Sequence, residues 1–257
     1  MTPMLRLSEV RKVFGGLVAL NDLSFEVAPG SIVAMIGPNG AGKSTVFNLI
    51  TGVYQPTHGS IDLEGRSLRG LDTAAIASLG IARTFQNVRL FAFMSARDNV
   101  MTGRHARMRA NLVDSLLHTP AQRAEEKSVR ERARELLRFV GLEREADSYA
   151  RNLPYGSQRR LEIARGLAGD PKLLLLDEPA AGMNPKEKES LIDLIGRIRA
   201  RGVTIFLIEH DMQLVMNVSE RVTVLDHGEK IAEGAPEVVR RDERVIEAYL
   251  GRADGAA

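Results

Sequence analysis

The stretch that most constrains the fold of this chain is residues 31–52, which read SIVAMIGPNGAGKSTVFNLITG. Ile32–Ile36 is an uninterrupted apolar run that predicts a buried strand. Gly37–Ser44 follows with the spacing G-x-x-x-x-G-K-S, and Thr45–Ile50 has the pattern of a helix that Gly52 ends. A strand, a glycine loop with a lysine and a hydroxyl, and then a helix are the parts of a P-loop, which binds nucleotide phosphates.

Phosphate chemistry explains why these residue types stand at this spacing. Gly37, Gly40 and Gly42 allow the backbone to curl so that successive N–H groups point inward. The helix that starts near Lys43 adds the positive end of its dipole. In such a loop the lysine reaches the β- and γ-phosphates, and Ser44 holds Mg²⁺. The alternative is a glycine-rich loop with an incidental Lys-Ser pair, but that would not require the flanking strand and helix.

Composition narrows the class of protein without identifying it. The 257 residues suffice for a large single domain, and 44% hydrophobic with 26% charged residues is ordinary for a globular protein. Lysine and arginine number 35 against 33 for aspartate and glutamate, so no basic surplus favours a nucleic-acid partner. The absence of cysteine excludes disulfides and thiolate metal sites. We find no signal peptide, no apolar run near the ~20 residues of a membrane span, and only one P-loop.

The residues around the P-loop predict strands. Residues 4–36 are rich in strands that alternate apolar and polar side chains, and another alternating strand is expected at 60–65. Phe14 lies between two of the early strands, where it either packs in the core or offers an aromatic surface to a purine. Residues 81–86 predict a further strand that ends at Gln86.

The second half of the chain predicts helices and then α/β alternation. Residues 97–152 are rich in Arg, Glu and Ala, and their apolar residues recur at helical spacing until Gly141. The apolar runs Leu173–Leu176 and 203–208 predict buried parallel strands, with a helix capped by Asn184 between them. The sequence therefore predicts an α/β fold with an antiparallel β-subdomain at its start and an inserted helical subdomain.

Polar side chains follow the expected strands. Asp177 and Glu178 end one apolar run, and a strand-terminal aspartate is the second metal-holding element of P-loop proteins. Glu178 is placed to polarise a water that attacks the γ-phosphorus. His210 ends the next strand, where it either packs in the core or contacts the γ-phosphate, and Gln86 is either a surface amide or a ligand of a metal or water.

Five motifs in chain order resemble those of an ABC-transporter ATPase. Walker A, Q-loop, signature, Walker B and H-loop correspond to Gly37–Thr45, Gln86, Leu153–Arg160 (LPYGSQRR), Leu173–Pro179 (LLLLDEP) and His210. The resemblance spans essentially the whole chain, and the signature separates ABC ATPases from other P-loop proteins. The nucleotide-binding residues that it implies are Phe14, Gly37, Pro38, Asn39, Gly40, Ala41, Gly42, Lys43, Ser44 and Thr45. The implied signature residues are Leu153, Pro154, Tyr155, Gly156, Ser157 and Gln158.

A narrower resemblance is to the larger ATPase subunit of high-affinity branched-chain amino-acid importers. It rests on KVFGGLVAL at 12–20, LPYG at 153–156, DEPAAGMNP at 177–185 and VIEAYLG at 245–251. The long helical insertion before the signature also favours this subunit over its shorter partner ATPase.

The resemblance also implies how the chain is divided. It implies one ABC ATPase domain with a P-loop (RecA-like) α/β core and β-subdomain at 1–96 and 158–234. The helical subdomain, with the signature, is expected at 97–157. A C-terminal helical tail is expected at 235–257.

The same resemblance implies a mechanism. Two ATPase subunits, identical or different, form a head-to-tail dimer that traps two ATP molecules, each between one subunit's P-loop and the other's signature. Phe14 stacks on adenine and Lys43 holds phosphates; Ser44, Gln86 and Asp177 organise Mg²⁺ and its waters. The catalytic residues are Glu178 as general base, His210 on the γ-phosphate, and Gln86. Two membrane permease subunits convert closure of the dimer into alternating access.

The chain departs from the common family pattern at two positions. The usual signature is L-S-G-G-Q, but this chain has Leu-Pro-Tyr-Gly-Ser at 153–157, so Pro154 replaces a serine and its hydroxyl contact to the γ-phosphate. Gly156 and the helix start after it still offer amides and a positive end. Asn184 replaces the usual D-loop aspartate, which removes a charge near the dimer axis.

Several functional alternatives follow from the sequence. The first is an ATPase of a branched-chain amino-acid importer, bound peripherally at the cytoplasmic face of the inner membrane and linked indirectly to a solute-binding protein. Others are an ABC ATPase for urea, short amides or lipid export, and a non-transport ABC ATPase that acts on ribosomes or DNA. The single P-loop, the lack of a coiled-coil insertion and the balanced charge disfavour the last class.

Overall fold

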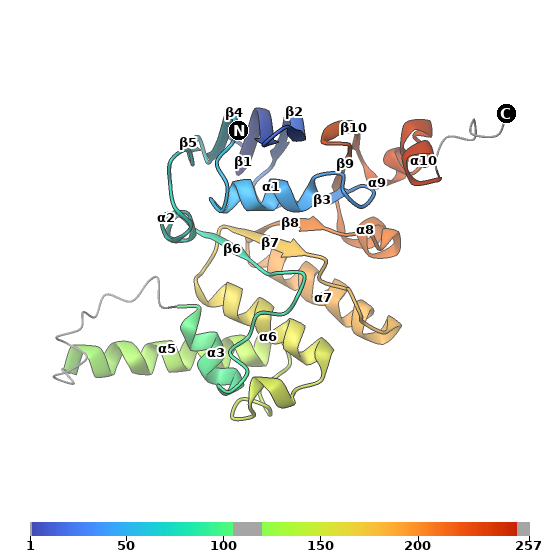
Figure 1. The fold of residues 1–257 in the computed structure, drawn as a ribbon. Coiled ribbons are helices and arrows are strands. Elements are labelled where there is room, and N and C mark those ends of the chain that lie inside the picture. The colour runs from blue at the N-terminus through green and yellow to red at the C-terminus, as the bar shows by residue number, and fades with distance from the viewer. Residues whose placement is uncertain (1, 105–119, 251–257) are drawn as a thin grey trace.

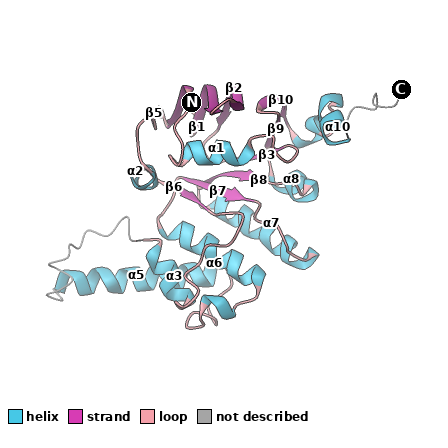
Figure 2. Cartoon of the chain, in the orientation of Figure 1, coloured by secondary structure: helices cyan, strands magenta, loops and turns pink. Residues whose placement is uncertain are grey.

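The computed structural model of the chain describes residues 2–104 and 120–250 (Figure 1). The predicted helical subdomain and C-terminal tail therefore each include a stretch outside the described residues, at 105–119 and 251–257. The described part has two sheets with helices between and below them, as Figure 2 shows by secondary structure.

A six-stranded sheet forms the centre of the molecule, in the order β10-β9-β3-β8-β7-β6. Its strands are β3 (Ile32–Ile36), β6 (Ile81–Arg83), β7 (Leu173–Asp177), β8 (Thr204–Ile208), β9 (Arg221–Asp226) and β10 (Glu229–Gly234). All neighbours are parallel except β10, which pairs antiparallel with β9 as the predicted hairpin. Because parallel strands end at the same edge, the segments after β3, β7 and β8 meet there.

The predicted parallel strands are apolar on both faces because each face lies against a core. Leu174, Leu176 and Leu207 belong to the apolar cluster on the side of the long helices. Leu175 and Phe206 belong to the cluster on the opposite side, with the antiparallel sheet. This two-sided burial explains why the runs read as uninterrupted rather than alternating.

The predicted strand at 81–86 is too long, since β6 ends at Arg83. Thr84 still binds the sheet, because its N–H donates to the carbonyl of Leu175 at 2.9 Å. Beyond it the main chain of Phe85 and Gln86 is bound by side chains of the helix α6 (Tyr155–Ala168) instead of a neighbouring strand. Gln86 therefore lies in a loop, not at the end of a strand.

A second, antiparallel sheet covers the helix that follows the P-loop. It has the order β2-β1-β4-β5, formed by β1 (Leu5–Phe14), β2 (Leu17–Val27), β4 (His58–Leu63) and β5 (Arg66–Ser67). Helix α1 (Lys43–Ile50) lies between this sheet and the central one, and α2 (Thr73–Ser78) follows β5 (Figure 1). The predicted β-subdomain is confirmed.

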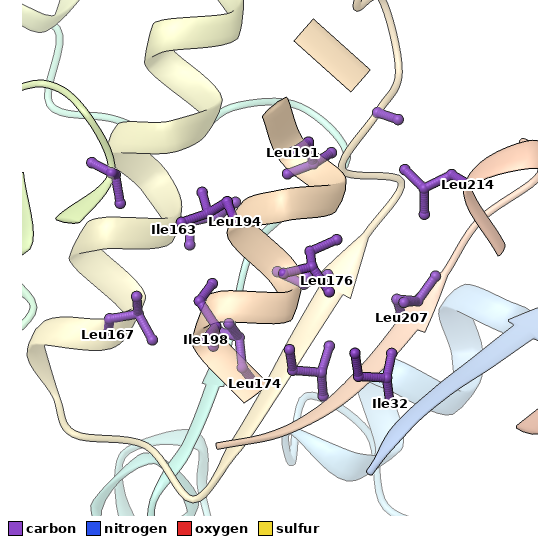
Figure 3. Close-up of a cluster of buried hydrophobic side chains, with 14 of the residues drawn as sticks. Ile32, Ile163, Leu167, Leu174, Leu176, Leu191, Leu194, Ile198, Leu207 and Leu214 are labelled. Carbon is purple, nitrogen blue, oxygen red and sulfur yellow. The ribbon is translucent and has the colours of Figure 1, made fainter. Parts of the chain in front are cut away.

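Helices α3 (Ala96–Thr102), α5 (Pro120–Phe139) and α6 pack together below the central sheet, and the 3₁₀ turn η2 (Ala150–Asn152) precedes α6. Helix α7 (Pro185–Ala200) fills the space between this group and β7. Figure 3 shows Leu194 and Ile198 of α7 between Ile163 of α6 and Leu174 of the sheet. The predicted boundary at 157 falls inside α6, which continues to Ala168 because its apolar face stays buried.

Helix α8 (Met212–Val218) connects β8 to β9, and the short helices α9 (Pro236–Val239) and α10 (Glu243–Leu250) follow β10. Helices α9 and α10 pack on the β9–β10 hairpin. Within residues 2–104 and 120–250, none of the helices combines the length and apolar character needed to cross a membrane.

Leu174→Ala tests the assignment of β7 to the core of the fold. The side chain is fully buried, so its truncation leaves a cavity and is expected to lower the free energy of unfolding by about 2–5 kcal/mol. Leu17→Ala is the matched control, because Leu17 is 69% exposed and its loss should change that energy by only about 0.5 kcal/mol. Urea denaturation of both variants measures the difference, and equal losses would contradict the assignment.

Candidate nucleotide-binding and hydrolysis site

The loop between β3 and α1 requires glycine at two positions. Gly37 and Gly42 have φ angles of +150° and +102°, a region that favours glycine. A Cβ at Gly37 would lie 2.0 Å from the carbonyl oxygen of Leu225, and one at Gly42 would lie 2.8 Å from that of Ala19. The backbone is thus free to curl around an anion only because both positions lack side chains.

Lys43 begins α1 and points back into the loop. Its Nζ donates hydrogen bonds to the carbonyl oxygens of Gly37 at 2.7 Å and Pro38 at 2.9 Å. Burial lowers the pKa of this ammonium, while the charges of Glu178 and Asp177 oppose that shift. Because β3 and β7 both pair parallel with β8, the P-loop and the two carboxylates share one edge of the sheet. The N-cap Gly42 provides no side-chain cap, which leaves the first N–H groups of α1 for an anion.

Asp177, the last residue of β7, is held by a cation from the neighbouring strand. Its Oδ2 accepts a hydrogen bond from a guanidinium nitrogen of Arg83 at 2.8 Å, and both side chains are less than a tenth exposed. Arg83 also donates to Asn48 of α1 at 2.7 Å. This buried pair fixes the aspartate carboxylate against the P-loop helix.

Glu178 leaves the strand with a strained backbone. Its φ of +45° is unusual for a residue with a side chain, and its N–H donates to Ile208 of β8 at 2.9 Å. The Oε2 of Glu178 accepts a hydrogen bond from Nε2 of Gln86 at 2.9 Å and lies 3.7 Å from Nδ1 of His210. The structure therefore brings all three predicted catalytic residues together, although Gln86 comes from a loop rather than a strand end.

A buried carboxylate that the sequence analysis missed supports this group. Glu209 is 1% exposed, and its carboxylate accepts hydrogen bonds from the N–H groups of Ala180 at 2.9 Å, His210 at 2.9 Å and Asp211 at 3.2 Å. It thereby joins the turn after Glu178 to the segment that carries His210. The sequence signal for this role is the position of Glu209, a charged residue directly after the apolar run of β8.

Phe14 lies at the end of β1 with 37% of its surface exposed. Its ring meets that of Tyr54 edge to face, with centroids 5.0 Å apart, and Nζ of Lys12 lies 4.9 Å from its centroid. The ring belongs to neither apolar core. It is available as an aromatic surface, and its stacking on adenine stays a prediction.

The predicted signature lies at the start of α6: Leu153 and Pro154 precede the helix, and Tyr155–Gln158 form its first turn. Pro154 occupies the N-cap position, and the space beside Gly156 is taken by Glu187 of α7, since a Cβ there would lie 2.4 Å from its Oε1. Gln158 donates to the carbonyl of Leu153 at 2.9 Å, which ties the motif together. Among the described residues, none of 153–158 hydrogen-bonds to the P-loop.

Asn184 has the capping role expected from the sequence. Its Oδ1 accepts from the N–H of Glu187 at 3.0 Å, and the Glu187 carboxylate accepts from the N–H of Asn184 at 3.0 Å. This capping box starts α7, so the cap accounts for an asparagine at position 184 without any role of a charge at the dimer axis.

The predicted Mg²⁺ ligands fit a metal that is shared with phosphates. Ser44, Gln86 and Asp177 offer hydroxyl, amide and carboxylate oxygens, the hard donors that Mg²⁺ prefers. No group of three or more His, Cys, Asp or Glu side chains that could hold a metal occurs within the part of the chain that the structure describes. A site with a single carboxylate suits an ion that takes its other ligands from substrate phosphates and water.

Removing Arg83 tests whether the buried pair is needed by the fold. Arg83→Met leaves the carboxylate of Asp177 buried without its partner, so we expect the free energy of unfolding to fall by about 3–5 kcal/mol. The double variant Arg83→Met/Asp177→Asn removes both charges and is expected to regain most of this loss. Urea denaturation measures the free energy of unfolding of both variants. If Arg83→Met loses no more of this energy than the double variant, the buried pair is not needed by the fold.

Comparison with known proteins agrees with the geometry. The family described as ABC transporter matches residues 20–181, and the family of branched-chain amino acid ATP-binding cassette transporters matches residues 229–255. The high-affinity branched-chain amino acid transport ATP-binding protein LivG of Salmonella typhimurium is 48% identical, over 98% of this chain and 99% of its own. The corresponding protein BraF of Pseudomonas aeruginosa is also 48% identical, with the same coverage.

Solved structures show the same fold. An ATP-binding cassette of an ABC transporter in its ADP conformation matches with a TM-score of 0.85 and 32% identity, over 98% of this chain and 100% of that one. A dimeric cassette in a post-hydrolysis state, bound to ADP and phosphate, matches with a TM-score of 0.77 and 27% identity, over 91% and 99%. The chain therefore belongs to the ABC transporter family of ATPases, in the group of branched-chain amino acid transport ATP-binding proteins.

Proposed function

We propose that this chain hydrolyses ATP to drive the import of branched-chain amino acids through membrane permeases. The proposal rests mainly on the cluster of Gln86, Glu178 and His210. This cluster lies near Lys43, at the edge of the sheet where the P-loop follows β3. The full-length similarity to transport proteins for these amino acids supports the choice of cargo.

The residues of the chain divide the chemistry between them. Lys43 and the amides of its loop bind phosphate oxygens, which can replace the two carbonyls that now accept from the ammonium. The Oε2 of Glu178 is held by Gln86, whereas its Oε1 makes no hydrogen bond to the described residues and is available to take a proton from water. His210 lies on the same side and is largely exposed, so it can reach a γ-phosphate.

Mg²⁺ would be held by Ser44, Asp177 and Gln86, and it would neutralise charge on the phosphates. Arg83 donates to Oδ2 of Asp177, so the other carboxylate oxygen would be the one to bind the ion.

The active form is proposed to be a dimer with a second ATPase subunit, of the same or a different sequence. The signature of this chain starts α6, which lies on the opposite side of the central sheet from the P-loop helix α1 (Figure 1), so each ATP would need the signature of the other subunit. The similar cassette that is dimeric with ADP and phosphate supports this arrangement.

The membrane partners are proposed to dock between the edge of the central sheet at β6 and the helices α3 and α6. A groove of about 560 Å³ opens there, lined by residues of α2, β6, α3 and α6, with the half-exposed ring of Phe91 among them. Its apolar lining suits a helix of a permease subunit. Through two permeases the chain would lie at the cytoplasmic face of the inner membrane, and a solute-binding protein would supply the cargo.

Glu178→Gln tests the assignment of the general base. Only the ability to accept a proton is lost, so ATP affinity should be unchanged while the turnover number falls by about 10²–10⁴-fold. Affinity is measured with a fluorescent ATP analogue and turnover by phosphate release. Glu189→Gln, an exposed glutamate of α7, is the matched control and should leave both values unchanged. Undiminished turnover in Glu178→Gln would overturn the role.

The cargo is tested by uptake in cells. Cells that lack this chain should lose energy-dependent uptake of labelled leucine, isoleucine and valine, and the wild-type chain but not Glu178→Gln should restore it. Labelled urea and acetamide serve as controls that should not respond. If urea or acetamide uptake depends on the chain and leucine uptake does not, the cargo assignment is wrong while the ATPase assignment stands.

A further inference from the structure

Two charged side chains of α6 are completely buried although neither was assigned a role: Arg159 lies near the end of the signature motif, and Glu162 lies outside the predicted motifs. Arg159 and Glu162 are each 1% exposed, and they form an ion pair one helical turn apart, with 3.2 Å between Nη1 of Arg159 and Oε2 of Glu162. Burial raises the pKa of the Glu162 carboxyl, with the N–H of Arg89 and the charge of Arg159 opposing the shift. Arg165 adds a second cation at 3.9 Å from Oε1 of Glu162. Burying such an ion pair costs desolvation free energy, so its presence needs an explanation.

The pair holds the main chain on both sides of Gln86. Glu162 Oε1 accepts from the N–H of Phe85 at 3.4 Å and from the N–H of Arg89 at 3.2 Å. The two terminal nitrogens of Arg159 donate to the carbonyl oxygens of Phe85 and Gln86. Four main-chain groups of the loop that carries the catalytic glutamine are therefore bound by two side chains of one helix.

The same helix begins with the signature. Tyr155 to Gln158 form the first turn of α6, and Arg159 is the next residue. A helix transmits a displacement of its first turn to its second, because its main-chain hydrogen bonds fix the rise per residue. Gln86 and the signature are thus mechanically joined across only a few residues, although they are more than 60 positions apart in the sequence.

A purely stabilising role explains the pair poorly. Apolar side chains of similar volume usually stabilise a protein as well as a buried ion pair does. Arg159 also leaves its Nε buried without a partner, which adds a cost that a packing residue would avoid. What an apolar pair could not supply is the set of directed hydrogen bonds to the loop of Gln86.

We propose that Arg159 and Glu162 are positioning residues that couple the two ATP sites of the dimer. The proposal rests on the proposed function, because the signature of this chain then completes the partner's site whereas Gln86 serves its own. When the ATP bound to the partner's P-loop draws the signature of this chain inward, α6 moves, and Arg159 and Glu162 move Gln86 together with α6. ATP binding at the site that contains this signature thereby sets the position of Gln86 at the other ATP site. Glu178, which accepts a hydrogen bond from Gln86, is positioned with it.

The test uses the double variant Arg159→Met/Glu162→Leu, which keeps volume and removes the hydrogen bonds. Its control is Arg138→Met/Glu143→Leu, the same change in an exposed ion pair of the helical layer. Since the chain has no cysteine, spin labels at Asn87→Cys and Asn152→Cys report the distance between the loop of Gln86 and the start of α6. In the subunit alone, that distance should be narrowly distributed in wild type and control and broad in the double variant. A narrow distribution in the double variant would overturn the proposal.

The second readout is ATP hydrolysis by the assembled transporter as a function of ATP concentration. We expect the Hill coefficient to fall to about one in the double variant, with ATP affinity of the single subunit unchanged. A wild-type Hill coefficient retained in the double variant would also overturn the proposal. If wild type itself shows no cooperativity, the two-site dimer is in doubt, whereas the spin-label distance still decides whether the pair holds the loop. Should the double variant fail to fold, Arg159→Met/Glu162→Gln is measured in its place, because it leaves no buried charge of the pair and still removes the donors to the carbonyls of Phe85 and Gln86.

Discussion

The parallel hydrogen bonding of β3, β8 and β7 is the constraint on which the rest of the structure depends. It places the carboxyl ends of the three strands at one edge, so the P-loop, Asp177-Glu178 and His210 meet although they are far apart in the sequence. The strands can lie side by side only because both faces of the sheet are covered, by α1 and the antiparallel sheet on one side and by α7 on the other (Figures 1 and 3). The burial of both faces of the sheet therefore allows the parallel pairing that brings the site residues together.

Buried charges complete what the strands begin. Lys43 donates hydrogen bonds to carbonyls of its own loop, whereas Asp177 pairs with Arg83 and Glu162 with Arg159. Each of these charged groups would be costly to bury without such a partner. Together they hold the catalytic side chains in fixed relations to three elements, namely the P-loop helix, the strand β6 and the signature helix.

The sequence predicted the parts that depend on local pattern. The P-loop, the buried strands, the capping box of Asn184 and the β9–β10 hairpin follow from spacing and side-chain type, and all are present. The exit of Gln86 from the strand, and the roles of Arg83, Glu209 and the Arg159–Glu162 pair, depend on contacts between distant segments. A charged residue within or beside an apolar run marks such contacts but does not identify the partner, which only the tertiary structure supplies.

The central claim is that this chain contributes two different halves to two composite ATP sites. Disulfide cross-linking in the assembled transporter tests it most directly, with a cysteine at Asn39 in the P-loop of the otherwise cysteine-free chain and one in the signature of the second ATPase subunit. The account predicts a cross-link between the subunits that forms with ATP and Glu178→Gln protein, and that decreases without nucleotide. Absence of that cross-link, together with a cross-link between Asn39→Cys and Ser157→Cys within one chain, would contradict it.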